Sequence, residues 1–220
     1  MIGAEKITIL NNDWITFVFL IILSILTIEK FLFENRLLKT SSFFFKKKNM
    51  LSYFNKEKNI FFNLYQILFF IVQLLTIALL LYYLNGFLGL KIGFAGLKLY
   101  IAIAIGVSLY FAFRLLTGIF LAFIFDIKSV HQKISFQKIS YFNNLILWIL
   151  PLLILSTYTK QFDDLIFKIT LAVFLFLLII RYGLLLINNK KLIFNNLFYF
   201  ILYLCALEIV PIVIILKLTI

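Results

Sequence analysis

The chain has 220 residues, of which 64% are hydrophobic and 14% are charged, and its formal net charge is +12. A soluble domain has about 25% charged residues, so this composition excludes a protein that covers its own surface in water. The positive charge does not indicate nucleic-acid binding, because the Lys and Arg residues lie between apolar segments, as they do in membrane proteins.

Six apolar runs are each long enough to cross the hydrocarbon core of a bilayer as a helix, which takes about 20 residues. They are residues 14–33, 60–84, 99–125, 139–158, 169–187 and 192–216. They lack the alternation of a membrane barrel, and open strands leave polar groups unpaired in lipid. We therefore expect an all-α, polytopic membrane helix bundle of about six transmembrane helices, with residues 1–220 forming a single integral membrane domain. The first run has no basic flank or small-residue cleavage site and is not expected to be a signal peptide.

The distribution of Lys and Arg predicts an orientation. With the N-terminus outside, the inner segments hold fourteen Lys and Arg residues and the outer segments hold six. Positive residues favour the cytoplasmic side, so both termini are predicted to be periplasmic in the inner membrane.

The connection at residues 34–58 is basic and rich in aromatic residues. It contains Lys46, Lys47 and Lys48, with Phe44 and Leu51 seven residues apart. This pattern favours an interfacial helix that contacts anionic lipid of the inner leaflet, where each Lys gains about 1 kcal/mol. The alternative is a solvated cytoplasmic loop without a partner.

Ionisable residues within spans are costly and therefore mark the first candidates for function. Four fall in the predicted spans: Glu29, Arg114, Arg181 and Glu208. The second run adds a polar stripe that we expect to face the bundle interior: Asn63, Gln66, Gln73 and Thr76. For each candidate the alternative is a structural pair with a neighbouring helix.

The third run is predicted to lie in the middle of the bundle. Arg114 and Thr117 form a polar stripe, and the nearly opposite face carries small residues one turn apart, namely Ala104, Ser108 and Ala112. Small residues let helices approach closely, so both faces are expected to pack. We expect Arg114 to turn inward, toward a carboxylate, a carbonyl or the Gln66 and Gln73 stripe.

Glu208 lies three residues before Pro211, which removes the hydrogen bond to the Leu207 carbonyl and bends a helix. A carboxylate beside a freed carbonyl can form a cation, proton or partner site, or it can simply pair with a neighbouring Arg or Tyr.

Soluble catalytic patterns are not found. The sequence has no phosphate-binding loop, nucleotide fingerprint or metal-binding motif, and we expect no cofactor. The single cysteine, Cys205, excludes an internal disulfide, and His131 falls in a predicted basic loop, where we expect it to be solvated.

Two elements carry a family resemblance: Asn11-Asn12-Asp13-Trp14 before the first run and Tyr203-Leu204-Cys205-Ala206-Leu207-Glu208-Ile209-Val210-Pro211 in the last. With them the chain resembles the membrane family catalogued as domain of unknown function 4271. The resemblance implies a bacterial inner-membrane protein of the Bacteroidota type of envelope, and it implies no activity.

Three functions remain open. The first is a non-enzymatic accessory or scaffold subunit of a cell-envelope assembly, with protein partners in the membrane. The second is a small transporter or an ion- or proton-coupled protein that uses Arg114 and Glu208. The third is a lipid-acting membrane enzyme.

Overall fold

The structure is a computed structural model, which describes residues 13–33, 64–89, 93, 95–126, 128–159 and 163–188. These residues form five helices and no strand: α1 (Asp13–Phe33), α4 (Leu64–Leu88), α5 (Leu97–Ile124), α6 (Lys128–Tyr158) and α7 (Asp163–Asn188). All five are long and apolar enough to cross a membrane, which confirms an all-α, multi-pass membrane fold. The predicted sixth span at residues 192–216, with Glu208, and the basic segment at residues 34–58, with Lys46, Lys47 and Lys48, lie outside the described residues.

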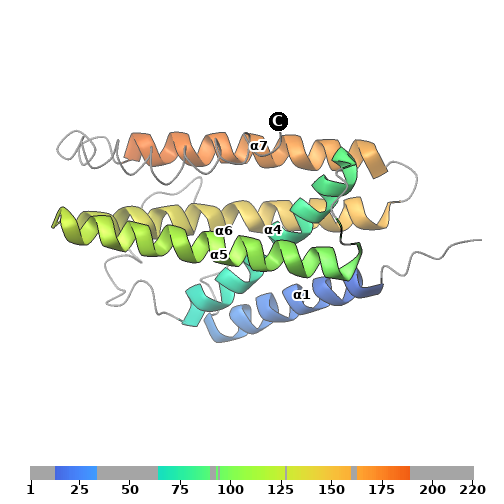
Figure 1. Cartoon of the computed structure of the whole chain (residues 1–220), viewed down its shortest axis with the longest axis horizontal. Coiled ribbons are helices and arrows are strands. Elements are labelled where there is room, and N and C mark those ends of the chain that lie inside the picture. Colours follow the sequence, from blue (N-terminus) through green and yellow to red (C-terminus); the bar gives the residue numbers. More distant parts are fainter. Residues whose placement is uncertain are drawn as a thin grey trace, which may run out of the picture.

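The helices pack side by side along the long axis of the molecule, except for α4, which crosses the others obliquely (Figure 1). Because of this course α4 contacts α1, α5 and α6, while α6 also contacts α5 and α7. The oblique helix and the central helix α6 therefore link the described parts of the bundle.

One end of the bundle, which we call the basic end, is where α1, α5 and α7 finish and α4 and α6 begin. Phe33 at the end of α1 contacts Tyr65 at the start of α4, with ring centroids 5.4 Å apart. The turn from α5 to α6 is tight and places Asp126 in the left-handed region at φ 51°, a conformation that Asp tolerates better than most residues. At the opposite, far end, α4 is terminated by Gly89 at φ 63°, where a side chain would be strained.

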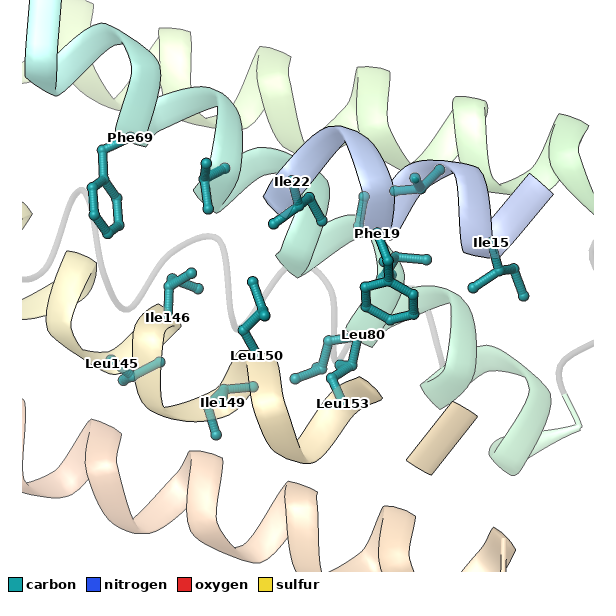
Figure 2. Close-up of a cluster of buried hydrophobic side chains, with 14 of the residues drawn as sticks. Ile15, Phe19, Ile22, Phe69, Leu80, Leu145, Ile146, Ile149, Leu150 and Leu153 are labelled. Atoms are coloured by element: carbon teal, nitrogen blue, oxygen red, sulfur yellow. The ribbon is translucent and has the colours of Figure 1, made fainter. Parts of the chain in front are cut away.

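The apolar core lies between α1, α4 and α6. Figure 2 shows Ile15, Phe19 and Ile22 of α1 facing α6, with Leu80 of α4 among them and Phe69 of α4 farther along α6, near Ile146; the α6 residues of the core are Leu145, Ile146, Ile149, Leu150 and Leu153. The buried positions on each helix recur at three- and four-residue intervals, which is the stripe that an α-helix presents to a neighbour. This packing holds the polar residues of α4 and α6 in fixed positions at the basic end.

The prediction that the third span is central is wrong. Only 11% of the α5 span is buried, against 56% of the α6 span, so α6 is the central helix and α5 is peripheral. Leu109, Phe113 and Leu116 of α5 are each about two-thirds exposed. Of the small-residue face, Ala104 packs against the core and Ala112 is exposed, so small residues permit close packing without making the whole helix central.

The central helix also begins earlier than hydropathy indicated. Residues 128–138, which we expected in a cytoplasmic loop, form the first three turns of α6. Hydropathy detects only the part of a helix that needs lipid, whereas Gln and Lys are good helix formers that extend it into the interface. The helix α7 likewise begins earlier than expected, at Asp163 rather than at residue 169.

Candidate functional site

Four helices bring polar side chains together in one cavity of about 240 Å³ at the basic end. Gln66 and Gln73 come from α4, Arg114 from α5 and Arg181 from α7. The start of α6 contributes His131, Ser135 and Lys138. We call this cavity the basic pocket, and it contains four of the six predicted intramembrane site residues.

Arg181 of α7 is held in place by contacts with α6. Arg181 is 6% exposed, and its guanidinium donates a hydrogen bond from Nη2 to the carbonyl oxygen of Lys138 at 3.2 Å and lies 4.6 Å from the centre of the Phe142 ring. The prediction placed Arg181 within a span near its inner end, and the structure places it seven residues before the end of α7. Its position is therefore fixed by a backbone bond and by stacking.

One face of α6 lines the pocket with His131, Ser135 and Lys138, which are spaced four and three residues apart. All three are at most 8% exposed, and the hydroxyl of Ser135 lies 3.2 Å from Nε2 of His131. The expectation that His131 is solvated is therefore wrong. Because α6 begins at Lys128, its first turns are helical and lie at the basic end, where α5 and α7 finish.

The amide stripe on α4 faces the bundle interior, as expected. Gln66, Gln73 and Thr76 are all at most 7% exposed, while Asn63 lies outside the described residues. The Gln73 amide donates a hydrogen bond to the side-chain carbonyl of Asn143 on α6. This bond joins α4 to α6 at the basic pocket, which Gln73 lines.

Arg114 is expected to turn toward a carboxylate, a carbonyl or the Gln66 and Gln73 stripe. Arg114 is half-buried and turns toward the pocket that Gln66 and Gln73 line, in agreement with the expected inward orientation. Glu29 of α1 is fully buried at the same end of the bundle but does not line this pocket. Glu208 and Pro211 lie outside the described residues.

The remaining wall is aromatic and apolar. Phe70, Phe111 and Phe142 form a row, with ring centroids 5.7 Å and 6.1 Å apart. Ile67 of α4 and Leu115 of α5 also line the pocket and are 47% and 41% exposed. The basic pocket is therefore lined by both polar and apolar side chains, and apolar side chains of α4 and α5 are exposed at its edge.

The charges of the pocket favour an anion. Arg114, Lys138 and Arg181 line it, and no Asp or Glu does so among the residues the structure describes. Cations at this depth require a counter-charge, hydrogen bonds or water, since exposing them to hydrocarbon is costly. The described residues contain no group of three or more His, Cys, Asp or Glu able to hold a metal ion.

The contact between His131 and Ser135 has the chemistry of a base beside a hydroxyl nucleophile. Both residues lie one turn apart on a single helix, however, and the helix geometry alone brings such pairs together. The contact therefore does not assign a nucleophile. Sequence reasoning missed both residues because it placed them in a loop, although their spacing of four residues was the available signal.

A second cavity of about 440 Å³ lies at the far end, and no charged residue lines it within the described part of the chain. It is lined by Tyr82, Tyr83, Asn85 and Ser156, among others. The side-chain oxygens of Asn85 and Ser156 are buried and have no hydrogen-bond partner among the described residues. Such groups are satisfied by water or by a ligand with donors.

Comparison with known proteins places this site in a family. The model of the family described as "Domain of unknown function (DUF4271)" matches residues 15–219, so the chain belongs to that family and the predicted family is confirmed. No curated protein and no solved structure matches the chain.

Proposed function

We propose that this member of the DUF4271 family is a non-enzymatic accessory or scaffold subunit of an inner-membrane assembly of the cell envelope, and that its working site is the basic pocket. The observation that carries the proposal is the convergence of Arg114, Lys138 and Arg181 from three helices on one half-open cavity. The site binds an anionic group. The accessory role rests on the sequence, which has short connections and no catalytic motif.

Electrostatics supports an anionic ligand. Arg114, Lys138 and Arg181 line one cavity, and positive charges that lie close together repel one another. An anion 4 Å from one of them gains about 4 kcal/mol at the effective dielectric constant of a protein surface. The summed positive charge of the cavity lining therefore favours an anionic ligand.

The proposed setting is the bacterial inner membrane with both termini in the periplasm and the basic end toward the cytoplasm. It is supported by the fourteen Lys and Arg residues in the inner segments, against six in the outer ones. In this orientation Lys46, Lys47 and Lys48 lie in a segment that leaves α1 and returns to α4 at the same end as the basic pocket. We propose that these lysines contact anionic lipid of the inner leaflet.

The test is purification of the tagged protein in a mild detergent, followed by native mass spectrometry. A membrane protein retained in fixed stoichiometry supports the accessory role, and a protein that always purifies alone contradicts it. For the site, sulfate and phosphate should raise the midpoint of thermal unfolding of the wild type. They should do so less for Arg114→Gln and Lys138→Gln. Lys168→Gln is the control, because Lys168 lies on α7 away from the pocket, over the Phe87 ring.

Transport is the second candidate function, and one arrangement favours it. Buried polar residues extend from the basic pocket into the bundle, namely Gln73, Thr76, Asn143 and Asn144, and beyond the apolar stretch at residues 145–155 of α6 the buried Ser156 lines the far cavity. Polar residues of this kind can support a hydrated path across the bundle. Anion flux into vesicles that contain the purified protein, lost in Arg114→Gln and kept in Lys168→Gln, would favour transport over the accessory role.

A further inference from the structure

We infer that the anionic group in the basic pocket is a phosphate carried by a membrane amphiphile, which reaches the pocket from the lipid side between α4 and α5. The inference rests on the proposed function, because it names the ligand class of the same site. It differs from the expected contact of Lys46, Lys47 and Lys48 with the membrane surface, since it describes one lipid in one cavity.

The mixed lining of the pocket matches an amphiphile. Arg114, Lys138 and Arg181 supply charge and hydrogen-bond donors from α5, α6 and α7. Phe70 of α4 and Phe111 of α5 supply apolar surface beside these groups, and their ring centroids are 5.7 Å apart. A free inorganic anion uses only the basic residues, whereas a lipid headgroup with its first chain carbons uses both the basic residues and the apolar surface.

The opening of the pocket faces the bilayer rather than water. Its α4 and α5 sides carry Ile67 and Leu115, apolar side chains that are nearly half exposed. The neighbouring surface of α5 is lipid-facing as well, with Leu116 67% exposed. A ligand that arrives along this surface keeps its hydrocarbon chains in lipid while its headgroup enters the protein.

The size of the pocket fits a headgroup and not a whole lipid. A cavity of about 240 Å³ is smaller than the roughly 300–1,000 Å³ of sites that enclose a drug-sized molecule. The chains of a two-chain lipid therefore remain outside, against the exposed apolar side chains of α4 and α5.

The depth of the pocket is that of the headgroup boundary. With 31 residues, α6 is about 46 Å long, so it exceeds a hydrocarbon core of about 30 Å by about 16 Å. Lys138 lies about 15 Å along the axis from the first residue of α6. With Tyr158 at the opposite boundary of the hydrocarbon core, Lys138 lies at the level where lipid phosphates meet the acyl region.

The chemistry of the three basic residues favours phosphate over a carboxylate. Arg181 is oriented by its bond to the Lys138 carbonyl and by the Phe142 ring, so its planar guanidinium is presented in a set direction. Guanidinium groups bind phosphate oxygens in pairs, and a phosphate accepts bonds from several directions at once. Arg114 and Lys138 approach from two other helices, which suits a tetrahedral group better than a planar one.

The experiment measures retention of lipid and of soluble phosphate by the full-length protein in detergent. Native mass spectrometry compares phosphatidylglycerol with phosphatidylcholine, and calorimetry compares glycerol 3-phosphate with inorganic phosphate. We expect phosphatidylglycerol to bind at least about tenfold more tightly than phosphatidylcholine, and Arg114→Gln and Lys138→Gln each to weaken it about tenfold or more. Lys168→Gln should change binding by less than about twofold.

The route between α4 and α5 is tested with Leu115→Trp, which fills the opening without removing charge. We expect it to weaken phosphatidylglycerol binding about tenfold and to leave inorganic phosphate binding unchanged. Arg181→Lys accompanies Arg181→Gln, so that a variant with the charge retained remains if the neutral variant fails to fold.

The outcomes distinguish the proposed anion site from the inferred lipid ligand. If no anion of any kind binds, or if binding is indifferent to Arg114 and Lys138, the proposed function fails together with this inference. If inorganic phosphate binds as tightly as phosphatidylglycerol and Leu115→Trp has no effect, the anion site stands and the lipid inference is overturned. Equal binding of phosphatidylglycerol and phosphatidylcholine overturns it as well.

Discussion

Arg181 of α7 donates a hydrogen bond from its Nη2 to the backbone carbonyl of Lys138 on α6, across 3.2 Å and 43 positions in the sequence. Its guanidinium also lies over the Phe142 ring of the same helix, 4.6 Å from the ring centre. One side chain thus ties the peripheral helix α7 to the central helix and forms one wall of the basic pocket.

Replacing Arg181 by Lys tests whether the planar guanidinium contributes to stability beyond its positive charge. The variant keeps the positive charge but loses the planar group that stacks on Phe142 and reaches the Lys138 carbonyl. We expect the unfolding free energy to fall by about 1–3 kcal/mol, because a charge-assisted bond and a cation–π contact are lost. Unfolding in mixed micelles with increasing dodecyl sulfate measures this. A stability equal to that of the wild type would show that the two contacts contribute nothing.

A double-mutant cycle should detect the bond between Gln73 and Asn143. Gln73→Leu and Asn143→Leu should each lower the unfolding free energy by about 1–2 kcal/mol, since each leaves one buried amide without its partner. The double variant should be less destabilised than the sum of the two, with a coupling of about 0.6–1.7 kcal/mol, the range of hydrogen bonds between membrane helices. Strict additivity would mean that the two amides are independent.

Much of the fold was predictable because lipid imposes a simple rule on the sequence. A run of about 20 apolar residues must become a helix in a bilayer, and five predicted spans correspond to described helices. The inward orientation of Gln66 and Gln73 was equally predictable from their shared stripe. Orientation relative to the membrane stays a prediction from the Lys and Arg count.

The error at His131 has a physical origin. Hydropathy separates lipid-soluble from polar residues, but it cannot tell a polar loop from a polar helical turn, and α6 continues through this region. The choice of a central helix failed for a related reason. Small residues on α5 show that close packing is permitted, whereas the identity of the packed neighbour depends on contacts between helices that are distant in the sequence.

The peripheral position of α5 predicts an asymmetry in packing sensitivity. Ile149→Ala on α6 removes a fully buried side chain and should cost about 2–5 kcal/mol, because it leaves a cavity. Leu116→Ala on α5 changes a side chain that is 67% exposed and should cost less than about 0.5 kcal/mol. Both are measured by the same micelle unfolding curve. Equal losses would indicate that another subunit covers the exposed face of α5 in the preparation.

Cysteine labelling should establish which end faces the cytoplasm. In a Cys205→Ser background, Gly93→Cys places a thiol between α4 and α5, at an exposed position with open space around it. An impermeant thiol reagent should label it in cells whose outer membrane has been opened. Lys128→Cys, at the exposed start of α6, should be labelled only after the inner membrane is permeabilised. The reverse pattern would place the basic end in the periplasm.

Asn144 provides the clearest distinction between a structural and a functional polar residue. It is 0% exposed, and neither its amide nitrogen nor its oxygen has a hydrogen-bond partner among the described residues. A buried amide in this state costs about 1–3 kcal/mol, so Asn144→Leu should leave stability unchanged or raise it by about 1 kcal/mol. The matched control is its neighbour, since Asn143→Leu breaks the bond with Gln73 and should destabilise the protein.

If Asn144→Leu instead lowers the midpoint of unfolding as much as Asn143→Leu does, the amide is held by a bound group. Abolished anion flux at unchanged stability would place Asn144 on the polar path of the transport hypothesis.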